Sequence, residues 1–464
     1  MFDLFDNTSE TALAILLLIA SAIEPAEADE GRVKPLFRDL VGLNVDFNFR
    51  PELYAPVCRL VRNYHNITWD VNHPGDPITF PRCVNGVDWD QHVYSPWRKR
   101  QFEIDLCAQI DSFGPSQADY KKWWDRQEKW IRQYGFEMAK YFGPSGAHKL
   151  VTSIEIGNEP GNKFDDALYR RLFAAMAQGI RMGDKQIKIA TAATRAGPAD
   201  EWLKSLDETY SEPEFLKLYD VINLHDYATR PARDGQSPWD RSYPEDPTIP
   251  YLSQIDEAIR WRDQHSPKKE IWISEFGYDA CTPAAMQRRQ GWFEKLNWRG
   301  QSDLEQAQYL VRSLLWFAER GVDRAYIFFY NDADQAAVHG ASGLTRNFEP
   351  KASYWAVRYF ARTLADFRFS RVVENVPGER TVVEFKQGRR GGRLMWVVWA
   401  PTGDGRQHLA TLANMPAVPT NAERMPTKDG RAEQVSWKTV GRGSIELSID
   451  GSPIILAFPP KHAD

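Results

Sequence analysis

The middle of the chain alternates short β-rich runs with amphipathic helices, and this alternation constrains the fold more than any other feature. Eight apolar runs stand out, at Val41–Val45, Leu60–Tyr64, Phe102–Gln109, Val151–Ile156, Ile187–Thr191, Val221–Leu224, Ile271–Ser274 and Ala325–Phe329. A helix or a long excursion follows each run, which is typical of parallel βα units. We therefore expect an α/β fold in which eight parallel strands close into a (β/α)₈ barrel, a TIM barrel.

An open, doubly wound sheet is the main alternative to a closed barrel. Such a sheet normally carries a glycine-rich phosphate turn after its first strand, and Gly42-Leu43-Asn44 is not one. The hydrophobic spacing predicts helices at Pro51–Arg59, Gln117–Phe142, Asp165–Met182, Leu304–Arg320 and Ser353–Leu364. Three long loops follow strands, at Thr68–Arg100, Ala228–Pro250 and Phe276–Ser302. We expect them at the C-terminal face, where barrel enzymes keep their active sites.

The pattern changes after about Phe367, where short strands separated by Gly- and Pro-bearing turns replace the alternation. The expected strands are Val372–Val376, Thr381–Phe385, Arg393–Trp399, His408–Ala413, Glu433–Lys438, Ser444–Ile449 and Ile454–Phe458. This pattern predicts a small antiparallel β-sandwich. We therefore divide the chain into a leader (1–28), a barrel (29–366) and a sandwich (367–464).

The leader contains an apolar run, Ala12–Ile23, followed by the small-x-small pattern Ala26-Glu27-Ala28. The run is too short to span a bilayer and fits the apolar region of a signal peptide. The residues before it are acidic and include no Lys or Arg, so a buried helix is the alternative. We expect a secreted or periplasmic protein, with no membrane span in the mature chain.

Composition excludes several classes of partner. The net charge of the 464 residues is only −5, which gives no polybasic footprint for nucleic acid or an anionic membrane. The nine histidines are scattered with no His-x-His, which argues against a metal-dependent barrel hydrolase. The four cysteines, Cys58, Cys83, Cys107 and Cys281, contain no Cys-x-x-Cys. In an exported protein they permit three disulfide pairings, and buried free thiols are the alternative.

Two of the predicted strands end in a glutamate. The run from Val151 ends in Asn158-Glu159-Pro160, and the run from Ile271 ends in Ser274-Glu275-Phe276-Gly277. By position they are the fourth and seventh strands of the barrel. A glycosidic bond is cleaved by two carboxyl groups that flank the anomeric carbon, one as acid and one as nucleophile or base. The pair therefore predicts a glycosidase site that needs no metal and no organic cofactor.

At these residues the chain resembles the glycoside hydrolases of clan A, and within them family 39 and its bacterial exopolysaccharide-cleaving relatives. The resemblance implies a retaining mechanism with Glu159 as acid/base and Glu275 as nucleophile. It implies that Asn158 binds the sugar 2-hydroxyl. Arg62, at the end of the second strand, would keep Glu275 anionic. His225-Asp226-Tyr227 ends the sixth strand, where the tyrosine hydroxyl of clan members bonds the nucleophile.

Further residues at strand ends and in loops are candidates for substrate contact. His65 ends the second strand, although a core histidine bonded to backbone is the alternative. Trp69 lies in a long loop, and many of the 17 tryptophans should instead be core. After the eighth strand the chain has Phe329-Tyr330-Asn331-Asp332 where many clan members place a tryptophan. We expect Tyr330 and Asn331 to contact the sugar there.

Three functions compete at the level of sequence. A hydrolase that cleaves a β-linked polysaccharide or oligosaccharide is the leading hypothesis. A transglycosylase shares the mechanism and differs only in excluding water. A barrel that binds glycan without cleaving it would not need both glutamates. The sequence leaves open the sugar, the choice between endo and exo action, the role of the sandwich and the oligomeric state.

Overall fold

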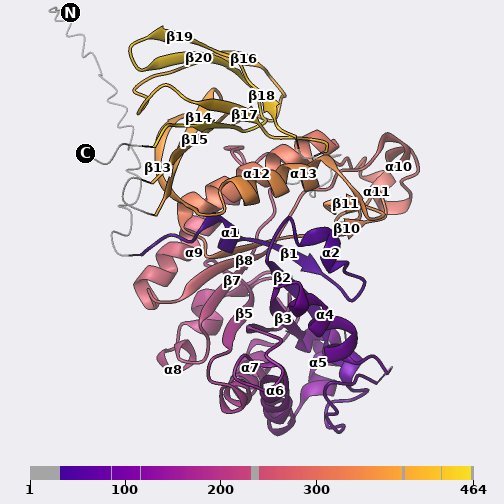
Figure 1. Cartoon of the computed structure of the whole chain (residues 1–464). Helices are drawn as coiled ribbons and strands as arrows, with labels where there is room; N and C mark the ends of the chain where they lie inside the picture. The colour runs from indigo at the N-terminus through magenta and orange to yellow at the C-terminus, as the bar shows by residue number, and fades with distance from the viewer. Residues whose placement is uncertain are drawn as a thin grey trace, which may run out of the picture. The chain divides into compact units, whose positions relative to one another are not determined.

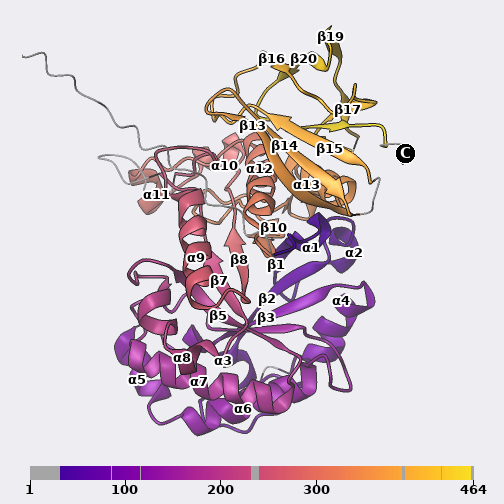
Figure 2. The same cartoon turned by 90° about the vertical axis from the view of Figure 1, so that its left-hand side faces the viewer.

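The computed structural model describes residues 32–460, apart from residues 85, 115, 231–239, 389–391 and 430. The expected leader, 1–28, lies outside the described residues. The chain from Lys34 onward forms one compact unit. In it a barrel of strands and helices carries a stack of antiparallel strands at one side (Figures 1 and 2).

Eight parallel strands form a closed barrel, in the order β4-β3-β2-β1-β9-β8-β7-β5, with β4 paired back to β5. They are β1 (Val41–Val45), β2 (Leu60–Asn66), β3 (Glu103–Gln109), β4 (Ser153–Ile156), β5 (Lys188–Arg195), β7 (Val221–His225), β8 (Glu270–Phe276) and β9 (Arg324–Ile327). The short β6 (Lys204–Ser205) extends the sheet beyond β5. Nearly every strand residue is buried, because side chains fill the barrel and helices cover it. The predicted TIM barrel is confirmed.

Amphipathic helices pack around the strands. The longer ones are α5 (Gln117–Trp124), α6 (Glu128–Phe142), α7 (Asp166–Gly183), α9 (Tyr251–His265), α12 (Asp303–Arg320) and α13 (Ala352–Thr363). One-turn helices complete the layer: α1 (Phe37–Leu40), α2 (Pro51–Tyr54), α3 (Ile67–Asp70), α4 (Ser95–Lys99), α8 (Pro213–Leu216), α10 (Pro283–Gln287) and α11 (Gly291–Lys295). Among the described residues, no helix combines the length and apolarity that a membrane crossing requires.

The single helix predicted over Gln117–Phe142 is wrong, because the structure divides it into α5 and α6. The chain turns between them at Arg126, whose φ of 60° is left-handed. No Pro or Gly marks the turn, and the apolar spacing continues across it. The sequence therefore carried no local stop signal of the kind that ends most helices. The predicted loop Thr68–Arg100 likewise contains the π-helical turn η1 (Trp89–Tyr94) and α4.

Beyond Phe367 two antiparallel sheets stack face to face. One has the order β13-β14-β15-β21-β17-β18 and the other the order β16-β20-β19. Their strands are β13 (Phe367–Val376), β14 (Arg380–Gln387), β15 (Leu394–Trp399), β16 (His408–Leu412), β17 (Asn421–Arg424), β18 (Glu433–Gln434), β19 (Trp437–Gly441), β20 (Ser444–Ile449) and β21 (Ile454–Ala457). The predicted sandwich is confirmed. The strand predicted at Glu433–Lys438 is wrong, since β18 and β19 belong to different sheets.

The strand β15 explains how the sandwich attaches to the barrel. All six of its residues are buried, so both of its faces are covered. Trp396 and Val398 pack inside the sandwich, whereas Val397 and Trp399 belong to the core of the barrel. Between the two, Glu245 accepts hydrogen bonds from the indole nitrogens of Trp316 (2.9 Å) and Trp399 (2.8 Å). The barrel and the sandwich therefore share one continuous apolar interface.

Small elements follow the barrel at its C-terminal face. The three two-residue strands β10 (Asn331–Asp332), β11 (Thr345–Arg346) and β12 (Glu349–Pro350) form a separate sheet after β9. The 3₁₀ turn η2 (Ile110–Ser112) follows β3, and the π-helical turn η3 (Leu206–Tyr210) follows β6. Both η2 and the β10–β12 sheet lie at strand ends, where they supply residues to the site described next.

Candidate active site

Three strand ends bring the predicted carboxylates together. Glu275 lies at the end of β8, and His225 ends β7 beside it in register. Glu159 follows β4 by three residues. Because the strands are parallel, all three side chains meet at the C-terminal face of the barrel.

Glu275 is 5% exposed and accepts three hydrogen bonds. Its Oε1 accepts from the Arg62 guanidinium at 3.0 Å and from the Tyr64 hydroxyl at 2.6 Å. Its Oε2 accepts from the Tyr227 hydroxyl at 2.8 Å. Charge-assisted bonds of this kind are stronger than neutral ones. They hold the carboxylate in one orientation.

The surroundings of Glu275 favour its charged form. Burial would raise the pKa of this carboxyl, but the charges of His225 and Arg62 and the hydrogen bond from Tyr64 outweigh it. The net result lowers the pKa of Glu275 to about 2. The group is therefore anionic throughout the neutral range, as a nucleophile must be.

Arg62 links the interior of the barrel to the site. It is fully buried, and its Nε and Nη2 each lie 2.7 Å from an oxygen of Glu155. This bidentate pair fixes the guanidinium plane. Nη1 then reaches Glu275, and Nη2 donates to Asn158 Oδ1 at 2.8 Å. Glu155 is 1% exposed and therefore lies deep in the barrel.

Glu159 sits on a short loop that a partly buried carboxylate holds in place. Asp111, in η2, accepts from the backbone N–H groups of Asn158 (3.1 Å) and Glu159 (3.2 Å). The loop leaves β4 through Gly157, whose φ of 89° disfavours other residue types. Burial raises the pKa of Asp111, and these backbone donors oppose that rise. The side chain of Glu159 itself remains 26% exposed.

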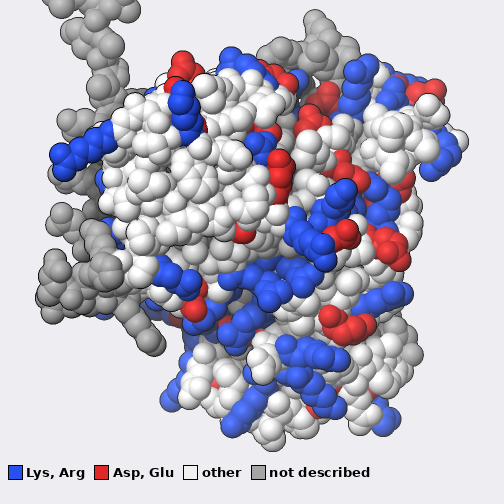
Figure 3. Space-filling view, turned by 45° about the horizontal axis from the view of Figure 1, so that its top comes forward, with Lys and Arg blue, Asp and Glu red and all other residues white. Residues whose placement is uncertain are grey.

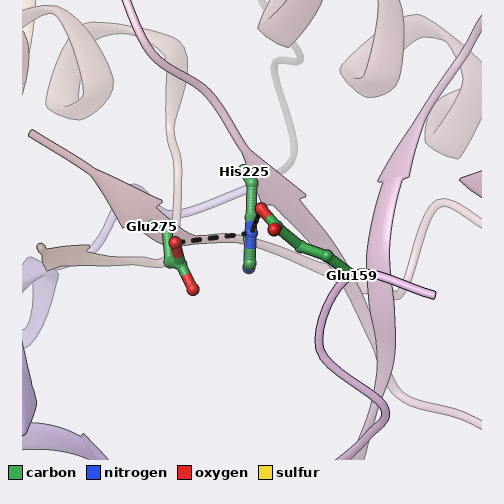
Figure 4. A group of neighbouring side chains, drawn as sticks. All are labelled: Glu159, His225 and Glu275. Atoms are coloured by element: carbon green, nitrogen blue, oxygen red, sulfur yellow. Dashed lines mark hydrogen bonds and ion pairs between the residues drawn. The ribbon is translucent and has the colours of Figure 1, made fainter. Parts of the chain in front are cut away.

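The imidazole of His225 lies between the two glutamates (Figure 4). Its Nδ1 is 2.8 Å from Glu159 Oε1 and 3.6 Å from Glu275 Oε2, and its Nε2 is 2.9 Å from Ser274 Oγ. Burial would lower the pKa of His225, but the charge of Glu275 and the hydrogen bond to Glu159 raise it overall. A carboxylate oxygen of Glu159 lies within 4.8 Å of one of Glu275. The two carboxyl groups therefore face the same small space at the C-terminal face of the barrel.

These three residues are also the one group, among the described residues, whose ligand atoms cluster as a metal site would require. Their hydrogen bonds fit that role poorly. Both oxygens of Glu275 already accept from cationic or hydroxyl donors, and both nitrogens of His225 are engaged. A divalent cation would also lie against the Arg62 guanidinium. The hydrogen-bond donors around Glu275 suit an anionic carboxylate that can react with an electrophile.

The other predicted site residues divide into two groups. Asn158 lies beside Glu159, and the bond from Arg62 to its Oδ1 fixes its amide so that the N–H groups are left to donate to a ligand. His65 instead is fully buried, with Asp70 at 2.6 Å and the Tyr94 hydroxyl at 2.9 Å. The structure gives His65 no access to a sugar, and we withdraw it as a substrate ligand. Its two polar partners explain why a histidine can occupy a core position.

Aromatic residues border the site on the side of β1, β2 and β9. Trp69 is half-buried, stacks on Trp89 at 5.9 Å between ring centres, and meets the exposed Phe47 edge-on at the same distance. Tyr64 contacts Phe328 edge-on, and Phe328 stacks on Phe329. Of these rings, that of Tyr64 lies beside Glu275, to which its hydroxyl donates.

A cleft of about 560 Å³ opens beside Phe329. Tyr330 and Asn331 line it, as do Asn48, Arg50 and His339. The Tyr330 hydroxyl donates to Asp46 at 2.7 Å, and Asn331 Oδ1 accepts from the Thr345 hydroxyl and from the backbone N–H of Phe348. The His339 ring packs on Tyr227, with 4.7 Å between ring centres, so the cleft adjoins Glu275.

Sequence reasoning missed two residues of the site, Tyr64 and Asp111. Tyr64 lies two residues beyond Arg62 on β2, so the period of two places both side chains on the same face. That signal was available. Asp111 lies in a turn after β3. The sequence around it carries no signal that its carboxylate bonds the loop that follows β4.

Two broader expectations concern tryptophan and cysteine. Nine of the 17 tryptophans are buried: Trp89, Trp97, Trp124, Trp261, Trp272, Trp298, Trp316, Trp396 and Trp399. Most tryptophans are therefore core, as predicted. All four cysteines are buried, and Cys58, Cys107 and Cys281 are free thiols. This agrees with the alternative of structural thiols.

Comparison with known proteins shows the fold. No protein-family model and no curated protein sequence matches the chain. Among solved structures, a family 39 glycoside hydrolase from the gut symbiont Bacteroides cellulosilyticus is similar, with a TM-score of 0.65 and 15% identity over 92% of this chain and 81% of the other. A family 30 endoxylanase from Clostridium papyrosolvens has a TM-score of 0.56 and 11% identity over 92% and 97%. A family 51 α-L-arabinofuranosidase from Bifidobacterium longum has a TM-score of 0.56 and 12% identity over the same shares.

Proposed function

We propose that this protein is a retaining glycoside hydrolase that cleaves a β-linked polysaccharide or oligosaccharide. The observation that carries the proposal is a pair of glutamates, one buried among donors and one partly exposed, with a carboxylate oxygen of each within 4.8 Å of the other. A spacing of about 5 Å suits double displacement, and about 6.5–9.5 Å suits inversion. The fold that the chain shares with solved glycoside hydrolases supports the same reading.

The reaction proceeds in two displacements. In the first, the Glu275 carboxylate attacks the anomeric carbon, the glycosidic C–O bond breaks, and Glu159 gives its proton to the departing oxygen. A covalent glycosyl ester on Glu275 results. In the second, Glu159 takes a proton from water, the water oxygen attacks the same carbon, and the ester bond breaks. The sugar leaves with its original anomeric configuration, and both glutamates return to their starting states.

The residues around the two glutamates assist both displacements through hydrogen bonds. Three donors hold the oxygens of Glu275 until one of these oxygens forms the ester bond to the sugar: Arg62, Tyr64 and Tyr227. The Asn158 amide is placed to donate to the sugar 2-hydroxyl, where hydrogen bonds strengthen in the transition state. No step needs a metal or an organic cofactor.

Two surfaces supply binding on either side of the scissile bond. The cleft of about 560 Å³ adjoins Glu275 and would hold sugar on the side of the covalent intermediate. On the other side, Trp202 is 49% exposed, and the ammonium of Lys163 lies 3.6 Å from its ring centre. A backbone hydrogen bond of 2.7 Å from Asn162 to Asp200 ties this tryptophan to the loop of Glu159. The exposed ring therefore suits the leaving group.

Product analysis tests the proposal. The full chain, and a Glu275→Ala variant, are incubated with β-linked polysaccharides and aryl glycosides, and the products are identified by mass spectrometry. We expect sugar release by the wild type only. Products longer than the added substrate would indicate a transglycosylase. Binding of a glycan without release, at equal affinity in both proteins, would contradict the proposal and favour a binding barrel.

A further inference from the structure

A basic surface lies at the end of the barrel opposite the two glutamates. Arg59 immediately precedes β2, and Arg38 lies in α1, which immediately precedes β1. Because the barrel strands are parallel, their starts lie at the opposite end from Glu275. Figure 3 shows Lys and Arg side chains gathered in a band across the face that carries α13.

One face of α13 supplies the aromatic part of this surface. Trp355, Arg358, Tyr359 and Arg362 follow the spacing i, i+3, i+4, i+7, so they form a single stripe along the helix. Together with Thr363 they line a hollow of about 360 Å³. The Arg358 guanidinium lies 5.4 Å from the ring centre of Trp355. The stripe therefore presents rings and cations side by side.

A second hollow, of about 320 Å³, adjoins the first. Arg362 lines both, and Arg38 and Arg59 line the second. We call the two hollows together the arginine groove. Four guanidinium groups line it, and Arg362 joins its two hollows.

The positive charge of the groove is largely uncompensated. Arg38 is paired with Asp366 and lies 3.8 Å from Asp39. The side chains of Arg59, Arg358 and Arg362 have no hydrogen-bond or ion-pair partner among the described residues, and Arg59 and Arg362 are exposed. The Tyr359 hydroxyl is engaged by Glu423 at 2.6 Å, which leaves its ring to line the groove.

We propose that the arginine groove is a second glycan-binding site that takes an acidic polysaccharide, one that carries carboxylate or sulfate groups. Guanidinium forks match the geometry of such anions. Tryptophan and tyrosine rings pack against the apolar faces of sugar rings. The choice of a polysaccharide rests in part on the proposed glycosidase function.

Nucleic acid fits the groove less well. Proteins that bind it by charge commonly neutralise about 6–10 phosphates, and this groove offers four arginines in a protein whose net charge is −5. A groove that tethers an acidic polymer would raise its local concentration near the active site without taking part in the chemistry.

Equilibrium binding of a polyuronate to the full chain tests the proposal. The variant is Arg358→Ser with Arg362→Ser, and the matched control is Arg126→Ser with Arg132→Ser, two exposed arginines outside the groove. We expect the groove variant to lose at least about tenfold in affinity, and the control to bind as the wild type does. Wild-type binding should weaken as salt is added.

Several results would overturn the inference. These are equal affinity in the groove variant and the control, equally tight binding of single-stranded DNA, or equal binding of a neutral glucan. Hydrolysis of aryl glycosides, measured on the same proteins, keeps this test separate from that of the proposed function. Loss of polyuronate binding with full hydrolysis supports the groove. Absence of hydrolysis with intact, arginine-dependent binding would instead count against the glycosidase alone.

Discussion

The two glutamates that we propose as catalytic, Glu159 and Glu275, differ in how the protein surrounds them. Glu275 is 5% exposed and accepts hydrogen bonds from Arg62, Tyr64 and Tyr227. The Glu159 side chain is 26% exposed, and among the described residues His225 is the one side chain that bonds its carboxylate. A single fold therefore gives two identical side chains opposite surroundings at the ends of two barrel strands, β4 and β8.

The difference matches the two tasks of a retaining mechanism. A nucleophile must stay charged and correctly aimed, which buried donors achieve. An acid/base must exchange its proton with a leaving group and then with water, so it needs access to solvent. We infer that environment, and not residue type, assigns the roles in this pair.

The largest expected effect follows from removing the nucleophile. Glu275→Ala should lower kcat by about a thousandfold or more, equivalent to about 4 kcal/mol of activation free energy, because the covalent route disappears. Steady-state kinetics on the best substrate measure it. Glu214→Ala, on the exposed helix α8, is the matched control and should retain full activity. An active Glu275→Ala enzyme would show that Glu275 is not the nucleophile.

Removal of the acid/base should have an effect that depends on the leaving group. Glu159→Ala should lower kcat/KM about 10²–10⁴-fold for unactivated glycosides, the usual contribution of general acid catalysis. For aryl glycosides with good leaving groups, kcat/KM should change little, because their departure needs little protonation. Comparing the two substrate classes measures the difference. Equal losses on both would show that Glu159 is not the acid.

Loss of a donor to the nucleophile should have a smaller effect. Tyr64→Phe removes a 2.6 Å bond to Glu275, and a hydrogen bond to a charged group is worth about 1.5–3 kcal/mol. The variant should lose about tenfold in kcat/KM at neutral pH. The donor lowers the pKa of Glu275, so its removal should raise that pKa and move the acid limb of kcat/KM to higher pH. Because the pKa of Glu275 is about 2, the wild type should show no acid limb above about pH 3, whereas Tyr64→Phe should show one. Profiles from pH 3 to pH 8 test this, and equally flat profiles for both proteins would contradict the assignment.

The smallest effect concerns stability and His225. Its folded-state pKa is raised, so its charged form stabilises the fold fully below the unfolded value of about 6.5. That stabilisation is lost as the pH rises through the folded pKa. The difference in Tm between the wild type and His225→Gln should therefore be largest near pH 5–6 and shrink above it. Thermal unfolding from pH 5 to pH 9 measures it, and a difference independent of pH would sink the prediction.

Much of the fold was predictable because barrel strands are locally recognisable. The apolar run Val41–Val45 coincides with β1, and the runs at the other strands overlap theirs, since strands buried on both faces are apolar throughout. β17 escaped prediction because its residues, Asn421–Arg424, include two charged side chains and no β-branched residue. Only its pairing with β21 makes it a strand.

The site residues that were predictable lie at the ends of barrel strands, where polar residues interrupt the apolar pattern. Glu159, Glu275, Arg62 and Tyr227 meet as the resemblance implied. From the sequence, His65 could not be distinguished from these residues. A histidine at a strand end can point towards the active site or into a polar pocket of the core. Asp70 and Tyr94 decide this, and both come from outside β2. Residues positioned by distant partners are those that a single sequence predicts least well.

Trapping the covalent intermediate tests the central claim most directly. The enzyme is incubated with a 2-fluoro glycoside of the sugar that it cleaves, which slows the second displacement, and the labelled peptide is identified by mass spectrometry. We predict a stoichiometric adduct on Glu275 that is absent from Glu275→Ala. An adduct on Glu159, or turnover with inverted anomeric configuration and no adduct, would contradict the division of roles between the two glutamates.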